Sequence, residues 1–224
     1  EFLTHFVNLA KLQPHESVLD VGCGIGRMAI PLTEYLKPQG GYWGFDIVRK
    51  GIDWCTDRIV PKFPHFHFQH SNVYNKHYNP EGTVRAADYV FPFEAGFFDF
   101  IFLTSVFTHM VPADLENYLK EIARVMKPGA RCLITMFLLN EKSRQLILDG
   151  KSDLDFRHEI DGYLTTKPSD PETAIAYDEQ VIRALFAKYG LEIAEPVHWG
   201  SWCGRVEYLS YQDIVVAVKR DEAR

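Results

Sequence analysis

Three glycines at alternate positions follow an apolar run in the stretch VLDVGCGIGRMAI, residues 18–30. An apolar strand that ends in glycines and continues as a helix brings backbone N–H groups and a helix N-terminus close to a ligand. A dinucleotide site would have the spacing G-x-G-x-x-G. Here Asp20 stands two positions before Gly22, and Gly26 comes one position too early for that spacing. A carboxylate beside such a turn favours a ligand that carries an amino group.

A second carboxylate, Asp46, ends the next apolar run, GYWGFDI, 20 residues after Gly26. A carboxylate at this place can accept hydrogen bonds from both hydroxyls of a ribose. Each signal alone has a simpler interpretation, because the glycines can form a plain tight turn and Asp46 can cap a helix that starts at Val48. The two signals together favour a site for a ligand that contains a ribose.

These stretches and two later ones resemble the class I S-adenosylmethionine-dependent methyltransferases. The matching stretches are, in chain order, VLDVGCGIG, GFDI, FPFEAGFFDFIFLTSVFTHM and EIARVMKPGARCLITMF. The resemblance covers residues 10–139 and, more loosely, the chain from residue 178 onward, and it is closest to the small-molecule and lipid-type members. It implies an enzyme whose cofactor is S-adenosylmethionine and whose second product is S-adenosylhomocysteine.

The resemblance also implies which residues bind the cofactor: Asp20, Gly22, Gly24, Gly26, Asp46, Ile47, Asn72, Val73 and Leu103. The glycines let the backbone approach the methionine part, and Asp20 reaches its amino group through water or backbone. Asp46 holds the ribose, and Ile47 packs on the adenine. The backbone near Leu103 receives the cofactor's amino group. The family commonly has aspartate at the position of Asn72, whose amide oxygen can still accept a hydrogen bond.

Methyl transfer from a sulfonium needs an aligned nucleophile and, for a hydroxyl acceptor, a base. His109 in TSVFTHM follows the fourth predicted strand, and imidazole titrates near neutrality, so His109 is the candidate base. A histidine that opens a helix can equally be a capping or packing group. The histidines of HFHFQH fit an ordinary strand better than a metal site, and no metal is expected.

The stretch WGSWCGR places Trp199, Trp202 and Arg205 close together in sequence. Two tryptophans beside an arginine can form a wall for a sugar, an aromatic ring or an anionic group of the acceptor. The alternative is that they seal a hairpin against the sheet. We predict the first role, at the mouth of the acceptor site.

Missing motifs narrow the acceptor. The sequence after the fourth strand has no N-P-P-Y or D-P-P-Y, no Pro-Cys nucleophile pair and no acidic metal-ligand set. A hydroxyl or amine of a small molecule is therefore the expected acceptor, with a sugar or lipid-linked glycan within that class. The alternatives are a non-catalytic module that binds S-adenosylmethionine and an NAD-dependent oxidoreductase. The early third glycine disfavours the oxidoreductase.

The elements that must position these residues alternate between strands and helices, which predicts an α/β, Rossmann-like, doubly wound sheet. We expect seven strands in the order 3-2-1-4-5-7-6, with strand 7 antiparallel after a hairpin. The strands are expected at residues 17–22, 41–47, 65–71, 98–105, 130–139, 191–199 and 211–220. The helices are expected near residues 26–37, 48–60, 113–126 and 178–189.

Residues 140–177 do not fit this alternation, since they begin as a possible helix and then become polar and proline-containing. We expect one domain over residues 1–224 with an insertion or lid at about 140–177. Its aromatic residues are sparse enough to suggest only transient packing. A mobile lid, helped by the residues before Lys11, would exclude water from the acceptor site.

The composition excludes other classes. The formal net charge is −6, the pI is about 5.8, and no basic stripe is present, so no nucleic-acid partner is expected. The four cysteines form no C-x-x-C pair, which indicates neither a zinc site nor a disulfide framework. No apolar stretch approaches the ~18 residues of a membrane helix, and no signal peptide precedes the first strand. We expect a cytoplasmic protein without membrane insertion; the pattern leaves its oligomeric state open.

Overall fold

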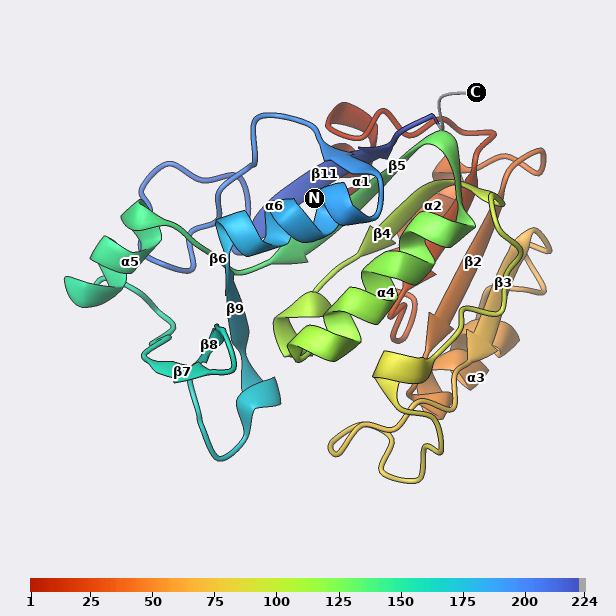
Figure 1. The fold of residues 1–224 in the computed structure, drawn as a ribbon. Helices are drawn as coiled ribbons and strands as arrows, with labels where there is room; N and C mark the ends of the chain where they lie inside the picture. The colour runs from red at the N-terminus through yellow and green to blue at the C-terminus, as the bar shows by residue number, and fades with distance from the viewer. Residues whose placement is uncertain (222–224) are drawn as a thin grey trace.

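The computed structural model describes residues 1–221. Its central sheet has seven strands in the order β3-β2-β1-β4-β5-β11-β10. They are β1 (Ser17–Val21), β2 (Gly41–Asp46), β3 (Phe66–His70), β4 (Phe98–Leu103), β5 (Met126–Met136), β10 (Leu191–Ile193) and β11 (Asp213–Lys219). The first five strands are parallel, and β11 is antiparallel to both of its neighbours. The predicted fold and strand order are confirmed (Figure 1).

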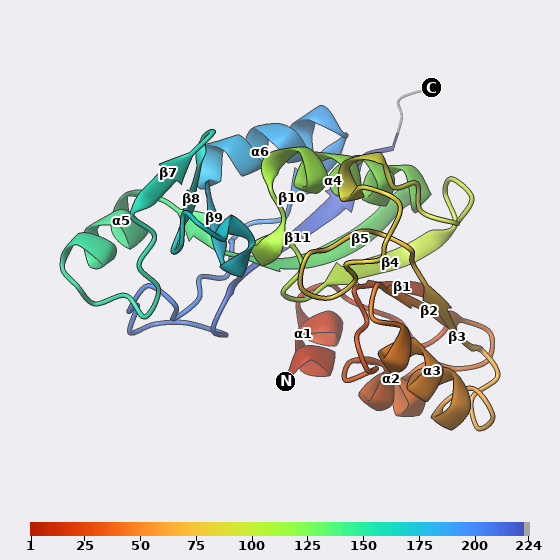
Figure 2. The same ribbon diagram turned by 90° about the horizontal axis from the view of Figure 1, so that it is seen from below.

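Helices cover both faces of this sheet (Figure 2). On one face lie α1 (Phe2–Asn8), α2 (Ala29–Tyr35) and α3 (Arg49–Arg58), and on the other lie α4 (Pro112–Val125) and α6 (Glu179–Lys188). Alternate residues of β1 therefore enter different cores: Val18 packs in the layer of α1 and α2, and Leu19 in the layer of α4 and α6. No helix within residues 1–221 has the length and apolar character needed to cross a membrane.

Several boundaries differ from the predicted ones, among them those of the strand expected at residues 130–139, where β5 runs from Met126 to Met136. Helix α2 starts at Ala29 because the residues before it form the glycine turn. Strand β10 ends at Ile193 and pairs antiparallel with β11 as predicted, but residues 194–212 make the connection between them a long loop. Helix α1 was not predicted. The centre of its Phe6 ring lies 5.4 Å from that of Phe100 and 4.4 Å from that of Phe102, and these contacts hold α1 on the sheet.

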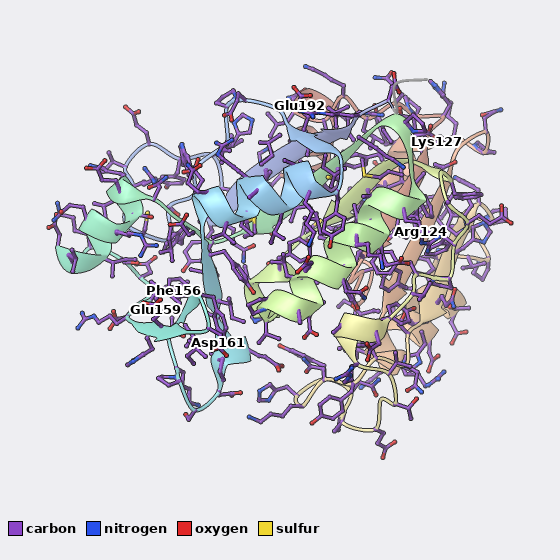
Figure 3. The ribbon with its side chains drawn as sticks, in the orientation of Figure 1. Arg124, Lys127, Phe156, Glu159, Asp161 and Glu192 are labelled. Carbon is purple, nitrogen blue, oxygen red and sulfur yellow. The ribbon has the colours of Figure 1, made fainter. Side chains whose placement is uncertain are left out.

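Polar contacts tie the C-terminal end of α4 and the start of β5 to β4 and to the segment before β4. Lys127 Nζ lies 2.8 Å from Asp99 Oδ2 at the start of β4, and Arg124 Nη2 lies 2.6 Å from Glu121 Oε2. Arg124 also donates to the carbonyl oxygens of Phe91 and Phe93. Figure 3 shows Arg124 and Lys127 at this end of the molecule. These contacts set the orientation of α4 without entering the functional site.

Residues 140–177 form a packed unit. Helix α5 (Glu141–Leu148) begins with a capping box, in which Asn140 Oδ1 accepts from Ser143 N and Ser143 Oγ accepts from Asn140 N. A second sheet follows in the order β6-β9-β8-β7. Its strands are β6 (Leu138–Leu139), β7 (His158–Ile160), β8 (Tyr163–Thr165) and β9 (Ile175–Asp178), and a short turn of 3₁₀ helix, η3 (Pro171–Thr173), precedes β9.

The aromatic residues of the insertion are buried, although the sequence suggested that they were too sparse to form a core. Phe156 is buried, and its ring lies 5.4 Å from those of both Phe137 and Trp202. Tyr163 and Tyr177 are buried as well. The insertion looks sparse in sequence because Phe137 and Trp202, which complete its core, lie outside it (Phe156 is labelled in Figure 3). Movement of the insertion on ligand binding stays a prediction.

Candidate active site

A cavity of about 570 Å³ lies at the carboxyl ends of β1, β2 and β4. Six predicted site residues line it: Gly22, Gly24, Asp46, Ile47, Val73 and His109. The other predicted residues do not: Asp20, Gly26, Asn72, Leu103, Trp199, Trp202 and Arg205. The fold thus joins most of the predicted cofactor set with the candidate base, and it separates the predicted acceptor wall from both.

The carboxylate of Asp46 ties the glycine turn to the start of α3. Its Oδ2 accepts a 2.7 Å hydrogen bond from Gly24 N, and its Oδ1 accepts one of 2.7 Å from Val48 N. Asp46 does not cap α3, whose N-cap residue is Val48 and has no side-chain cap, and each carboxylate oxygen keeps a lone pair that a ribose hydroxyl can use. Asp46 anchors the turn and also lines the cavity.

The glycines of this turn serve close packing as well as ligand access. Gly22 has φ +82°, and a Cβ there would lie 2.6 Å from Val106 Cγ2, in the segment after β4. A Cβ on Gly26, with φ +76°, would lie 2.9 Å from Cys55 Sγ of α3. Gly26 is buried and lets α3 pack against the turn, so it supports the site without lining it.

A further glycine that the sequence reasoning missed, Gly51, lets α3 touch the turn. A Cβ on Gly51 would lie 2.6 Å from the carbonyl oxygen of Gly24. Glycine to alanine in a helix normally stabilises by about 0.5–1 kcal/mol. We expect Gly51→Ala to destabilise instead, by about 1–3 kcal/mol, because α3 must move away from the turn.

Urea unfolding of Gly51→Ala checks this, with Thr56→Ala as the control on the exposed face of the same helix. Thr56→Ala should be as stable to urea as the parent or slightly more stable. If Gly51→Ala unfolds at a higher urea concentration than the parent, the close approach of α3 and Gly24 is wrong.

Asp20 lies beneath the turn and is 1% exposed. Its Oδ2 accepts a 2.6 Å hydrogen bond from the hydroxyl of Tyr42, while its Oδ1 has no partner among the described residues. Burial raises the pKa of Asp20 to about 8, even though the hydrogen bond from Tyr42 acts in the opposite direction and lowers it. The carboxylate does not reach the cavity, so any contact with a cofactor would have to pass through water or backbone.

The raised pKa of Asp20 predicts a pH-dependent stability. The folded state keeps a proton that the unfolded state loses above its ordinary pKa of 3.8, so the free energy of unfolding falls between about pH 4 and pH 8. The slope from this group is about 1.4 kcal/mol per pH unit. Asparagine cannot titrate, and its carbonyl can still accept from Tyr42. Asp20→Asn should therefore remove this slope.

Urea unfolding of Asp20→Asn and the parent across this pH range measures the difference between the two slopes. Asp57→Asn, at an exposed position of α3, serves as the control and should follow the parent. Parallel stability curves for Asp20→Asn and the parent would show that Asp20 is ionised in the folded protein.

The structure treats two further predicted cofactor residues differently: Asn72, expected at the adenine, and Leu103, whose backbone was expected at the amino group. Asn72 is exposed, and its Nδ2 donates to Thr83 Oγ1 at 2.8 Å, so its side chain is held outside the cavity that its neighbour Val73 lines. The side chain of Leu103 is fully buried in the core. The prediction for Leu103 concerned the backbone, and the next residue, Thr104, lines the cavity.

The predicted acceptor wall is a packing cluster. Trp202 is fully buried, and its indole N–H donates to Asp213 Oδ2 at 2.8 Å. The guanidinium of Arg205 lies 4.9 Å from the centre of the Trp199 ring and donates to Asn140 Oδ1. The predicted location at the mouth of the site is therefore wrong for these three residues. They seal the 194–212 loop against the sheet and the insertion.

His109 lies in a short turn of 3₁₀ helix, η2 (Phe107–His109), and is held by the insertion. Its Nδ1 lies 2.8 Å from the carbonyl oxygen of Glu172. A carbonyl oxygen only accepts, so Nδ1 must carry the proton in this contact. In the neutral imidazole Nε2 then holds a lone pair. No hydrogen bond joins Nε2 to another residue within 1–221.

The cavity contains polar residues that the sequence reasoning missed, among them Asn75, Asp114 and Glu172. Burial raises the pKa of Asp114, and the nearby charge of Glu172 raises it further. Asp114 looked like an ordinary acidic residue in the first turn of a helix. Glu172 lies in η3 and Asn75 in the loop after β3, and only the fold brings them to the cavity.

Comparisons with known proteins agree with this geometry. The family described as "Methyltransferase domain" matches residues 1–195. A structure of an S-adenosylmethionine-dependent methyltransferase from Methanosarcina mazei aligns with a TM-score of 0.59 and 21% identity, over 94% of this chain and 95% of that one. An Aquifex aeolicus S-adenosylmethionine-dependent methyltransferase aligns with a TM-score of 0.54 and 20% identity, over 93% and 84% of the two chains.

Magnesium protoporphyrin IX methyltransferase from Synechocystis, solved with bound S-adenosylhomocysteine, has a TM-score of 0.60 and 17% identity. The alignment covers 98% of this chain and 81% of that one. At these identities the structural neighbours show a shared fold, and the family match covers most of the chain. This chain therefore belongs to the methyltransferase domain family and is a class I S-adenosylmethionine-dependent methyltransferase.

Proposed function

We propose that the protein transfers a methyl group from S-adenosylmethionine to a hydroxyl or amine of a small molecule, with a sugar or a lipid-linked glycan within this class. His109 is the proposed base. The observation that carries the proposal is the contact between Nδ1 of His109, a residue that lines the cavity, and the Glu172 carbonyl. In the neutral ring this contact requires the proton on Nδ1 and so leaves the lone pair on Nε2. A small-molecule acceptor, a cytoplasmic location and the lack of a nucleic-acid partner stay predictions.

The residues at the cavity fit the cofactor. Asp46 offers an anchored carboxylate for the ribose, and the apolar side chains of Phe45, Ile47 and Val73 offer contacts for the adenine. Gly24 has no atom within 4 Å of the position of a Cβ, so its backbone is open to the methionine part. When bound, S-adenosylmethionine supplies a methyl group that its sulfonium has already activated for displacement.

The chain's own part in the reaction is to align the acceptor and remove a proton. An attacking hydroxyl becomes an ether oxygen and gives up its proton, which Nε2 of His109 can accept. The polar groups of Asn75, Asp114 and Glu172, which also line the cavity, can hydrogen-bond to a polar acceptor. A neutral amine needs this base less, because it can lose its proton to water after the attack.

Incubation with a metabolite extract and S-adenosylmethionine that carries a deuterated methyl group tests the proposal. We expect a labelled product that mass spectrometry identifies, and its loss when S-adenosylhomocysteine is added in excess. Asp46→Ala should lose the same product, while the exposed control Asp57→Ala should keep it. Cofactor binding without a labelled product from any extract would favour the non-catalytic alternative.

A further inference from the structure

Three consecutive residues of the loop after β3 bind the η3 turn of the insertion. Lys76 Nζ lies 2.9 Å and His77 Nε2 lies 3.1 Å from Asp170 Oδ1. Asn75 Nδ2 donates to Glu172 Oε2 at 3.2 Å. The two segments are more than ninety residues apart in sequence, and both lie at the lower edge of the molecule in Figure 1.

Asp170 is the centre of this contact. Its side chain is 16% exposed, although it lies at the surface of the insertion, and hydrogen bonds from Lys76 and His77 lower its pKa to about 2. It also belongs to the backbone of the turn, since Thr173 N donates to Asp170 O at 3.1 Å. Asp170 therefore joins the turn to a different loop, in addition to the hydrogen bonds that Thr165 Oγ1 makes to Pro171 O and Asn75 Nδ2 makes to Glu172.

The same turn supplies the carbonyl that holds His109. Glu172 lies two residues after Asp170, and its carbonyl oxygen is 2.8 Å from His109 Nδ1. A neutral histidine has two tautomers, and the hydrogen bond at one ring nitrogen selects between them. A displaced turn would release Nδ1, and the tautomer with the proton on Nε2 would become populated. That tautomer cannot accept a proton at Nε2, the nitrogen that the Glu172 carbonyl does not bind.

We propose that Asp170 is a positioning residue for His109. Its contacts with Lys76 and His77 fix the η3 turn, and the Glu172 carbonyl then keeps the proton of His109 on Nδ1. This inference rests on the proposed function in one respect: the tautomer matters for catalysis only if His109 is the base. Asp170 itself does not line the cavity.

Nitrogen-15 NMR of histidine-labelled protein tests this without an acceptor, at a pH above the ordinary pKa of histidine. His109→Asn assigns the His109 signals by their loss. We expect the parent protein to show one tautomer with the proton on Nδ1. Asp170→Ala should lose at least half of that population to the other tautomer, and Asp170→Asn, which can still accept a hydrogen bond, should restore most of it.

Asp155→Ala is the matched control, because Asp155 also belongs to the insertion and pairs with Arg157 on the surface, away from the cavity. It should leave the His109 signals unchanged. Lys76→Ala removes one of the two contacts to Asp170 and leaves that of His77, so it should shift the tautomer in the same direction by a smaller amount. It tests the inference even if Asp170→Ala fails to fold.

A parent protein with the proton on Nε2, or an unchanged tautomer in both Asp170→Ala and Lys76→Ala, would overturn the inference. An equal change in Asp155→Ala would also overturn it, since any loosening of the insertion would then suffice. These outcomes are separate from the proposed function, whose failure would appear as a missing labelled product from a protein with the expected tautomer.

Discussion

Replacement of His109 by asparagine is expected to slow transfer to a hydroxyl acceptor about 10²–10⁴-fold, the usual contribution of a general base. The asparagine amide can still donate to the Glu172 carbonyl, so the contact that holds the turn need not be lost. The variant has no group at this position that can accept a proton near neutral pH. Its affinity for S-adenosylhomocysteine should equal that of the parent.

Single-turnover transfer of labelled methyl to the identified acceptor measures this rate, and calorimetry measures the affinity. His158→Asn is the control, because His158 is an exposed residue of β7 and does not line the cavity. The size of the effect also distinguishes acceptors, since a neutral amine needs less help from a base. A hydroxyl acceptor that His109→Asn methylates at the parent rate would contradict the base assignment.

The cofactor side of the site could be predicted because its signals are local. The carboxyl ends of parallel strands meet at one edge of the sheet, so the glycine turn and Asp46 had to lie together once the strand order was right. The local signals did not show that the side chain of Asp20 is buried beneath the turn. Alternation along β1 puts Asp20 on the same face as Val18, which packs with α1 and α2, and this pattern could have shown that Asp20 points away from the cavity.

The acceptor side could not be predicted because its residues depend on distant partners. Two tryptophans near an arginine can be a substrate wall or a sealed cluster, and the choice depends on groups such as Phe137 and Asp213 that lie elsewhere in the chain. Glu172 gave no signal, since its role comes from its backbone carbonyl as much as from its side chain. A carbonyl is present at every residue, so no residue type marks it.

Asp46→Ala is expected to weaken the binding of S-adenosylmethionine and S-adenosylhomocysteine by about a hundredfold or more. Charge-assisted hydrogen bonds contribute about 1.5–3 kcal/mol each, and two ribose hydroxyls would lose them. About 1.4 kcal/mol corresponds to a tenfold change in affinity. The variant should also be less stable by about 1–3 kcal/mol, because Gly24 N and Val48 N lose their acceptor.

Asp46→Asn separates these two roles of the carboxylate. Its single carbonyl oxygen can accept from one of the two backbone N–H groups, so part of the stability should return. Its amide nitrogen cannot accept from a ribose hydroxyl, and the charge is gone, so the affinity should stay well below that of the parent. Calorimetry with S-adenosylhomocysteine and urea unfolding give the two numbers for each variant, with Asp57→Ala as the exposed control on α3. If stability falls while affinity is unchanged, Asp46 only anchors the turn, and the ribose must be held by another group at this cavity.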